Sequence, residues 1–273
     1  MAKTGVPDAG ELRLGRIALP AGKQVIANYG SGAPVAWATV SKVPGAGRAW
    51  SALSDAHQET GLVPFLLSGL HGGSTERPWD LGEFGDIEDV TLIDQLDPER
   101  LLRERWDGET HEEGIAEEDE DEDFRDYLQE KVGPFGRQFP GLAPAEDRQL
   151  SSEVLQDVLG ALPDARIGLT PAARPADVLP LIGWEGAVNS TTSLPIAAVL
   201  RSWEDRFGAR LLDIGFAEIR LLVSRPPRTI GAAQRIAAEH VVFCDECGGQ
   251  GLTEVSTIAA SLLESPVWTF WWD

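Results

Sequence analysis

The spacing of apolar residues predicts a long helix in the C-terminal half of the chain. Five apolar side chains recur there at the intervals of one helix face: Ile196, Val199, Leu200, Trp203 and Phe207. Pro195 stands in the first turn, where a missing backbone N–H costs little, and Gly208 follows at a position that often ends a helix. We therefore expect a helix with one buried face that begins near Pro195 and ends before Gly208.

Two strands and two more helices are predicted after this helix. Residues 209–214 and 216–223 are rich in apolar and β-branched side chains, which is typical of strands. Thr229 can cap a helix that reaches His240, and a further helix is predicted over residues 253–264.

The chain ends in an aromatic segment, residues 267–273, which we expect to form a strand that closes the sheet. Tryptophan is costly to leave in water and usually packs against other apolar groups. Because side chains alternate along a strand, Trp268, Phe270 and Trp272 are predicted to face one way and the residues between them the other way. One of these faces can belong to the core, whereas Trp271 on the second face needs a helix, a partner or a ligand to cover it.

The N-terminal region predicts fewer elements. Residues 24–29, 35–40 and 62–67 indicate strands, and residues 48–60 indicate a helix that ends at Gly61. Pro64 places the third strand near a sheet edge or a bulge, because proline cannot donate a ladder hydrogen bond.

The order of these elements predicts an α+β protein, with a mixed sheet, helices packed on it and the aromatic strand closing the core. We expect three regions: an N-terminal α+β region at 1–105, an acidic and partly disordered insert at 106–148, and a C-terminal α+β domain at 149–273. The order helix, glycine, strand occurs at 50–67 and again at 196–214, which leaves open a weak internal duplication.

The formal net charge of −21 comes mostly from one segment. Between Asp107 and Glu130 there are 13 acidic residues and one basic residue, so the remaining chain is only moderately acidic. Nucleic acids and anionic membranes require a basic surface, so we expect neither as a partner. The N-terminus lacks a secretory signal, the chain has no membrane-length apolar run and it holds only two cysteines, which together predict a cytoplasmic protein.

Four blocks carry rare residues in a recognisable order. They are Leu-Ile-Gly-Trp-Glu-Gly at 181–186, the block at 199–211, Ala-Ala-Glu-His at 237–240 with the following Phe243-Cys244, and the aromatic ending at 268–273. Together they resemble a bacterial family named domain of unknown function 4253, and residues 60–67 and 77–79 are similar to its upstream regions. The resemblance implies a C-terminal fold unit over about 181–273, and it implies no reaction and no catalytic residue.

Cys244 and Cys247 are separated by two residues, and His240 lies four residues before the first of them. The three side chains could bind zinc, although a closed zinc site needs a fourth ligand. The two cysteines could also form a redox pair, although such pairs usually open a helix rather than follow one. The remaining alternative is two thiols without a chemical role, and His240 is open either to proton transfer or to simple packing at a helix end.

The tryptophans suggest an aromatic pocket with a polar rim, and a plain aromatic core is the alternative. The candidate binding residues are Trp184, Asn189, Arg201, Trp203, His240, Trp268, Trp271 and Asp273. No catalytic residue is predicted, because the chain has neither a nucleophile elbow nor a phosphate-binding loop.

We therefore expect a non-catalytic binding or interaction protein, with an immunity-type role among the options. Its partner would be a protein or a small molecule, and no cofactor is predicted. The alternative is a small-molecule or metal-dependent enzyme that uses His240 with Cys244 and Cys247 or with nearby carboxylates.

Overall fold

The computed structural model describes residues 5–29, 32–69, 77, 79, 83–111, 122–244 and 254–272. Residues 112–121 of the predicted acidic insert lie outside these ranges. Within them, no helix is both long enough and apolar enough to cross a membrane.

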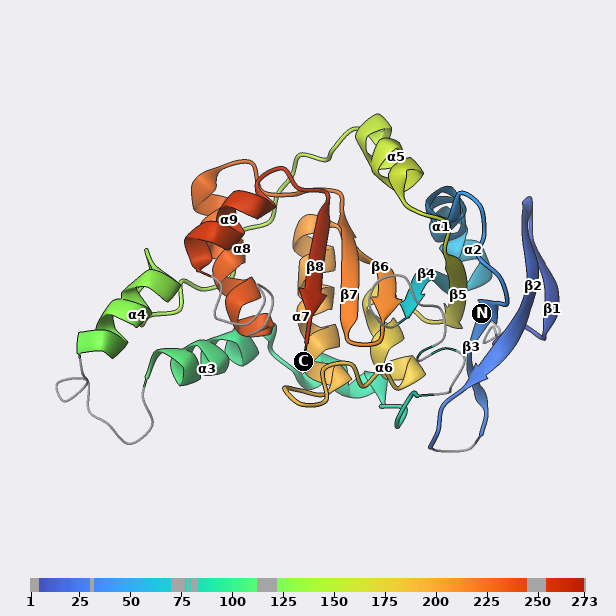
Figure 1. The fold of residues 1–273 in the computed structure, drawn as a ribbon, viewed down its shortest axis with the longest axis horizontal. Coiled ribbons are helices and arrows are strands. Elements are labelled where there is room, and N and C mark those ends of the chain that lie inside the picture. The colour runs from blue at the N-terminus through green and yellow to red at the C-terminus, as the bar shows by residue number, and fades with distance from the viewer. Residues whose placement is uncertain are drawn as a thin grey trace.

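The protein is built on one mixed sheet with helices packed on it, which confirms the predicted fold class (Figure 1). In the described residues the sheet has eight strands: β1 (Gly10–Leu14), β2 (Ile17–Ile26), β3 (Pro34–Thr39), β4 (Leu62–Gly69), β5 (Arg166–Pro171), β6 (Ala209–Gly215), β7 (Glu218–Val223) and β8 (Val267–Trp271). Their order across the sheet is β1-β2-β3-β5-β4-β6-β7-β8. Neighbouring strands are antiparallel, except that β4 and β6 run parallel.

Helices pack on both faces of this sheet and extend beyond its β8 end (Figure 1). They are α1 (Ala46–Asp55), α2 (His57–Thr60), α3 (Pro98–Thr110), α4 (Glu122–Val132), α5 (Ser152–Ala161), α6 (Val178–Ile182), α7 (Ser193–Phe207), α8 (Ile230–Phe243) and α9 (Val255–Leu262), with short 3₁₀ turns η2 (Val90–Gln95) and η3 (Pro175–Asp177). In Figure 1, α8 and α9 lie at the β8 end, α1, α2 and α5 lie toward β5 and β3, and α7 lies behind the sheet.

Each face of the sheet carries its own hydrophobic core. Along β4, Val63, Phe65 and Leu67 belong to the larger core, whereas Leu62 and Leu66 belong to the smaller one. This alternation follows from the two-residue period of a strand. Helices α6, α7, α8 and α9 contribute to the larger core, and α1 and α5 contribute to the smaller one.

The local signals for the helices are confirmed. Gly208 ends α7 with a φ of 60°, and the hydroxyl oxygen of Ser224 lies 2.1 Å from the place where a Cβ would stand, so a larger residue would clash there. The side chain of Thr229 accepts a hydrogen bond from the backbone N–H of Ala232 and caps α8.

Of the two alternatives for Pro64, the sheet edge is wrong, because β4 lies in the interior of the sheet between β5 and β6, whereas its pairing with β6 does carry a bulge or irregularity between Leu67 and Gly69. The pairing with β6 begins only at Leu66, beyond the proline, so the missing N–H interrupts no hydrogen bond to that strand. The carbonyl oxygen of Pro64 instead accepts a hydrogen bond from the indole of Trp50, at 3.0 Å.

Strand β5 is not predicted from the sequence, although it joins the two halves of the sheet. It carries Gly168, where an added Cβ would lie 2.2 Å from the ring of Phe65, so that ring can lie over this position only because the residue is glycine. Because β5 pairs with both β3 and β4, the predicted N-terminal and C-terminal regions share one sheet. The exact domain boundaries stay a prediction.

The two units of the suggested duplication end in neighbouring parallel strands, β4 and β6. Their helices, however, serve different cores: α1 contributes to the smaller core and α7 to the larger one. The two units therefore differ in how they pack.

Candidate functional site

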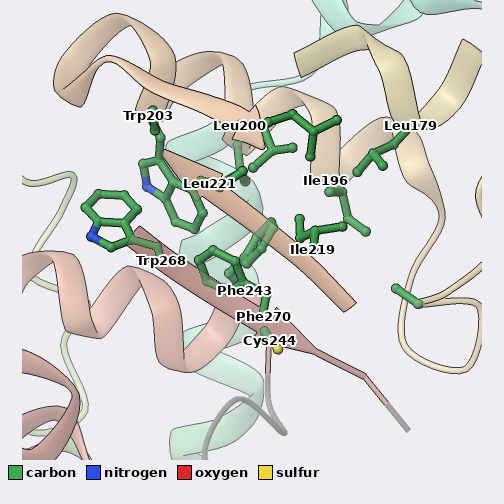
Figure 2. Packing of buried hydrophobic residues seen from close by; sticks show 14 of the residues in the cluster. Leu179, Ile196, Leu200, Trp203, Ile219, Leu221, Phe243, Cys244, Trp268 and Phe270 are labelled. Atoms are coloured by element: carbon green, nitrogen blue, oxygen red, sulfur yellow. The ribbon is translucent and has the colours of Figure 1, made fainter. Parts of the chain in front are cut away.

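The aromatic ending forms part of the larger core, as the alternation of its side chains predicts. Trp268, Phe270 and Trp272 are all buried, with at most 1% of each exposed. Trp203 of α7 stacks on Phe270 at 5.3 Å between ring centroids and meets Trp268 edge-on at 5.6 Å (Figure 2). Trp184 meets Trp272 edge-on in the same way. These tryptophans pack as core, and Trp184 also lines a hollow together with Asn189.

Trp271 lies on the other face of β8 and is 39% exposed. Its carbonyl oxygen lies 3.0 Å from the sulfur of Cys244. Asp273, the last predicted binding residue, lies outside the described residues.

His240 is enclosed by aromatic rings and is only 4% exposed. Its ring centroid lies 4.7 to 4.9 Å from those of Phe270, Trp268 and Trp203. Burial, helped by the positive charge of Arg206, lowers the pKa of His240 to about 3. The imidazole is therefore neutral at neutral pH and sits where a dissolved substrate does not reach it.

Cys244 ends α8 and is buried. It is disulfide-bonded in this structure, so its sulfur carries no thiol proton. Cys247 lies outside the described residues. Among the residues that the structure does describe, no three His, Cys, Asp or Glu side chains gather in a way that could hold a metal ion.

Arg201, one of the predicted binding residues, forms ion pairs within the fold, and so does Arg206. Arg201 contacts the carboxylates of Asp177 at 2.6 Å and Asp94 at 2.7 Å. Arg206 donates two hydrogen bonds to the fully buried carboxylate of Glu239, at 2.8 and 2.6 Å. These side chains hold neighbouring elements together.

Glu239 is the centre of a buried polar network. Besides Arg206, its carboxylate accepts hydrogen bonds from the indole of Trp203 and from the backbone N–H of Ala143, both at 2.7 Å. Arg206 also donates to the carbonyl oxygen of Ala143 at 2.8 Å. The network thus joins α7, α8 and the segment before α5, and it leaves little unpaired charge for a ligand.

A polar pocket of about 240 Å³ lies between α1, α2, β4, η3, α7 and β6. We call it the Arg210 pocket, and it is lined by Trp50, Ser54, Asp55, His57, Gln58, Val63, Pro64, Pro175, Glu204, Arg210 and Leu211. None of the predicted binding residues lines it.

Arg210 is half-buried in this pocket, and its guanidinium lies 5.2 Å from the ring centroid of Trp50. Within the described part of the chain, this guanidinium makes neither a hydrogen bond nor an ion pair. Burial lowers the pKa of Arg210, and the negative charges of Asp55 and Glu204 oppose that effect from a distance. Arginine stays charged in proteins, so the pocket holds a cation whose donors are unused.

The acidic groups of the pocket differ in their surroundings. Burial raises the pKa of Glu204, although Arg174 opposes the shift with its Nε at 3.4 Å from the carboxylate. Asp55 is exposed at the end of α1 and has no partner among the described residues. His57 has its Nε2 at 2.9 Å from the carbonyl oxygen of Ala172. Since that oxygen can only accept, Nε2 carries a proton, and the Nδ1 of the neutral ring is left as an acceptor.

A second hollow, of about 290 Å³, brings together Trp184 and Asn189 of the predicted set. Among its charged residues, Arg77 forms an ion pair with Glu83 and lies 4.9 Å over the ring of Phe216, whereas the carboxylate of the exposed Glu185 has no partner in the described part of the chain. The Arg210 pocket differs from this hollow in that its arginine is unpaired.

Sequence reasoning missed the Arg210 pocket. Arg210 and Glu204 stand in the block at 199–211, and His57 is one of only four histidines. The separation of these residues along the chain hid their proximity, because only the pairing of β4 with β6 places α1 and α2 beside them.

Residues 166–273 match the model of a family described as "Domain of unknown function (DUF4253)". The match includes β5 to β8 and begins before residue 181, where the four blocks that suggested the resemblance start, whereas residues 60–67 and 77–79 lie outside it. Glu204 and Arg210 lie inside the matched region, whereas Asp55 and His57 lie before it. No curated protein and no solved structure matches the chain.

Proposed function

We propose that this chain, whose residues 166–273 belong to the DUF4253 family, is a non-catalytic binding protein that holds a small molecule in the Arg210 pocket. The observation that carries the proposal is the half-buried guanidinium of Arg210, which faces a cavity with all its donors unused. A structural arginine at such a position would normally be paired, as Arg201 and Arg206 are.

The pocket is also preformed. Trp50 is fixed by its hydrogen bond to Pro64, and its ring in turn supports Arg210. A ligand would therefore lose little of its binding free energy to reorganisation of the protein.

The geometry favours binding over the alternative of an enzyme based on His240. That imidazole is enclosed by three aromatic rings and stays neutral far below neutral pH. The cytoplasmic location and the existence of a protein partner stay predictions from the sequence.

The proposal is tested by thermal unfolding of the full chain against a library of small metabolites, including acids, amines, amino acids, sugars and nucleotides. A ligand at about a hundred times its Kd stabilises the folded state by about 2.7 kcal/mol, which corresponds to a rise in Tm of about 5–10 °C for a chain of this size. We expect at least one such compound for the natural chain.

The matched variants are Arg210→Gln and Arg235→Gln, the second at an exposed position of α8. The rise in Tm should disappear in the first variant and persist in the second. If every stabilising compound acts equally on both variants, or if no compound stabilises the natural chain, the Arg210 pocket is not a binding site.

A further inference from the structure

We infer that the ligand of the Arg210 pocket is a small zwitterion of the amino-acid class, with its carboxylate on Arg210 and its ammonium group on Asp55. This inference rests on the proposed function and specifies the ligand of the same site.

The Arg210 pocket contains two opposite charges that do not form a salt bridge with each other. Arg210 and Asp55 both line the cavity and carry opposite charges, yet neither has an ion-pair partner within 4.0 Å in the described part of the chain. Their attraction acts only through space. A molecule that carries the same two charges in the reverse order can occupy the gap and pair with both residues at once.

Arg210 suits a carboxylate. Its planar guanidinium can donate two parallel hydrogen bonds to the two oxygens of one carboxylate. The guanidinium also lies over the ring of Trp50, whose position is fixed by its hydrogen bond to the carbonyl oxygen of Pro64, and this contact restrains the orientation of the guanidinium.

The pocket also suits an ammonium group, because two carboxylates and an imidazole line it, and the side chains of Ser54 and Gln58 can accept as well as donate. Asp55 offers an unused carboxylate, and His57 offers Nδ1 because its other ring nitrogen donates to Ala172. Glu204 adds a second carboxylate, which Arg174 already contacts.

The charges of the pocket favour a zwitterion over ligands that carry two like charges. A dicarboxylate would bring a second negative charge toward Asp55 and Glu204, and a diamine would bring a positive charge toward Arg210. A zwitterion adds no net charge to a partly buried site, which avoids an unpaired buried ion.

The volume of the cavity limits the size of the ligand. The cavity of about 240 Å³ is smaller than the roughly 300–1,000 Å³ of pockets that hold drug-sized ligands. Val63, Pro175 and Leu211 line it as well and can contact an apolar side chain of the ligand.

The test measures Kd by calorimetry for the full chain with each of the common amino acids. Every amino acid that binds is then compared with two analogues, the amine that lacks the carboxylate and the acid that lacks the ammonium group. We expect at least one amino acid to bind, and both of its analogues to bind at least tenfold more weakly.

The variants separate the two charged contacts. Arg210→Gln and Asp55→Asn should each weaken the amino acid at least tenfold, while Arg235→Gln and Asp157→Asn, which change exposed residues on α8 and α5, should leave Kd unchanged. Circular dichroism of each variant shows whether it folds, and Asp55, being exposed, is expected to tolerate the change.

The outcomes distinguish this inference from the proposed function. If the acid analogue binds as tightly as the amino acid, or if Asp55→Asn has no effect, the zwitterion is wrong while the Arg210 pocket remains a binding site. The same holds if only compounds other than amino acids bind in a manner that depends on Arg210. If no compound depends on Arg210 at all, the proposed function fails as well.

Discussion

Replacing Phe270 and Trp271 one at a time by alanine tests the two-faced character of the last strand. The two residues are neighbours in β8 and differ in burial: Phe270 is completely buried, whereas Trp271 is 39% exposed. Both substitutions remove an aromatic ring from the same strand, so each serves as the control for the other.

The magnitude follows from the contacts of Phe270. Its ring stacks on Trp203 and meets Phe243 and His240 edge-on at 4.8 and 4.7 Å, so the alanine variant leaves a cavity in the larger core. Substitutions of this kind cost about 3–5 kcal/mol. Because a folded domain is stable by only about 5–15 kcal/mol, Phe270→Ala should come close to unfolding the protein.

Trp271→Ala should cost about 1 kcal/mol, because the ring already contacts water. Equilibrium unfolding in urea, followed by circular dichroism, gives the midpoint and the slope for each variant. Equal losses for the two variants, or a larger loss for Trp271→Ala, would refute the assignment of Phe270 to the core face and Trp271 to the open face.

The remaining predictions concern the buried polar groups. The pKa of His240 is about 3 when folded against about 6.5 when unfolded, so below pH 6.5 only the unfolded chain takes up the proton. Because of His240, the free energy of unfolding of the natural chain therefore falls by up to about 1.4 kcal/mol for each pH unit between 6.5 and 3. His240→Gln lacks this loss, so its free energy of unfolding minus that of the natural chain should rise as the pH falls from 7 to 4.5. If urea unfolding gives the same difference between the two proteins at every pH, the burial of this imidazole is contradicted. Glu239→Gln removes the countercharge of Arg206, which is itself only 13% exposed, and should cost about 3 kcal/mol in the same assay. Glu264→Gln, which breaks an exposed ion pair, should cost less than about 1 kcal/mol, and equal costs for the two glutamate variants would show that the buried network contributes no more than a surface pair.

Much of the C-terminal half was predictable from residues that are close together in the chain. The apolar face of α7 and its end at Gly208 depend on residues three or four positions apart and on one backbone conformation. The division of β8 into a buried and an open face depends only on its two-residue alternation. Such patterns can be recognised because the physical interactions behind them are local.

Other features depended on contacts that no local pattern encodes. Strand β5 is short, has both faces buried and contains Gly168, so nothing in its own sequence shows that it pairs between β3 and β4. The burial of His240 likewise depends on rings that arrive from α7 and β8.

The sequence by itself determined helices α7, α8 and α9, the cap residues Gly208 and Thr229, and the side of the last strand that faces the core, because each depends on spacing and on the cost of exposing apolar surface. It did not determine strands β1 and β5, and the single helix predicted over residues 48–60 is divided into α1 and α2. Only the tertiary structure decided which charges are paired. Arg201, a predicted binding residue, and Arg206 pair with carboxylates inside the fold, whereas Arg210 and Asp55 line one pocket without forming an ion pair. Charged side chains carry no periodic signal, and whether one finds a partner is settled by the pairing of strands that are distant in the chain.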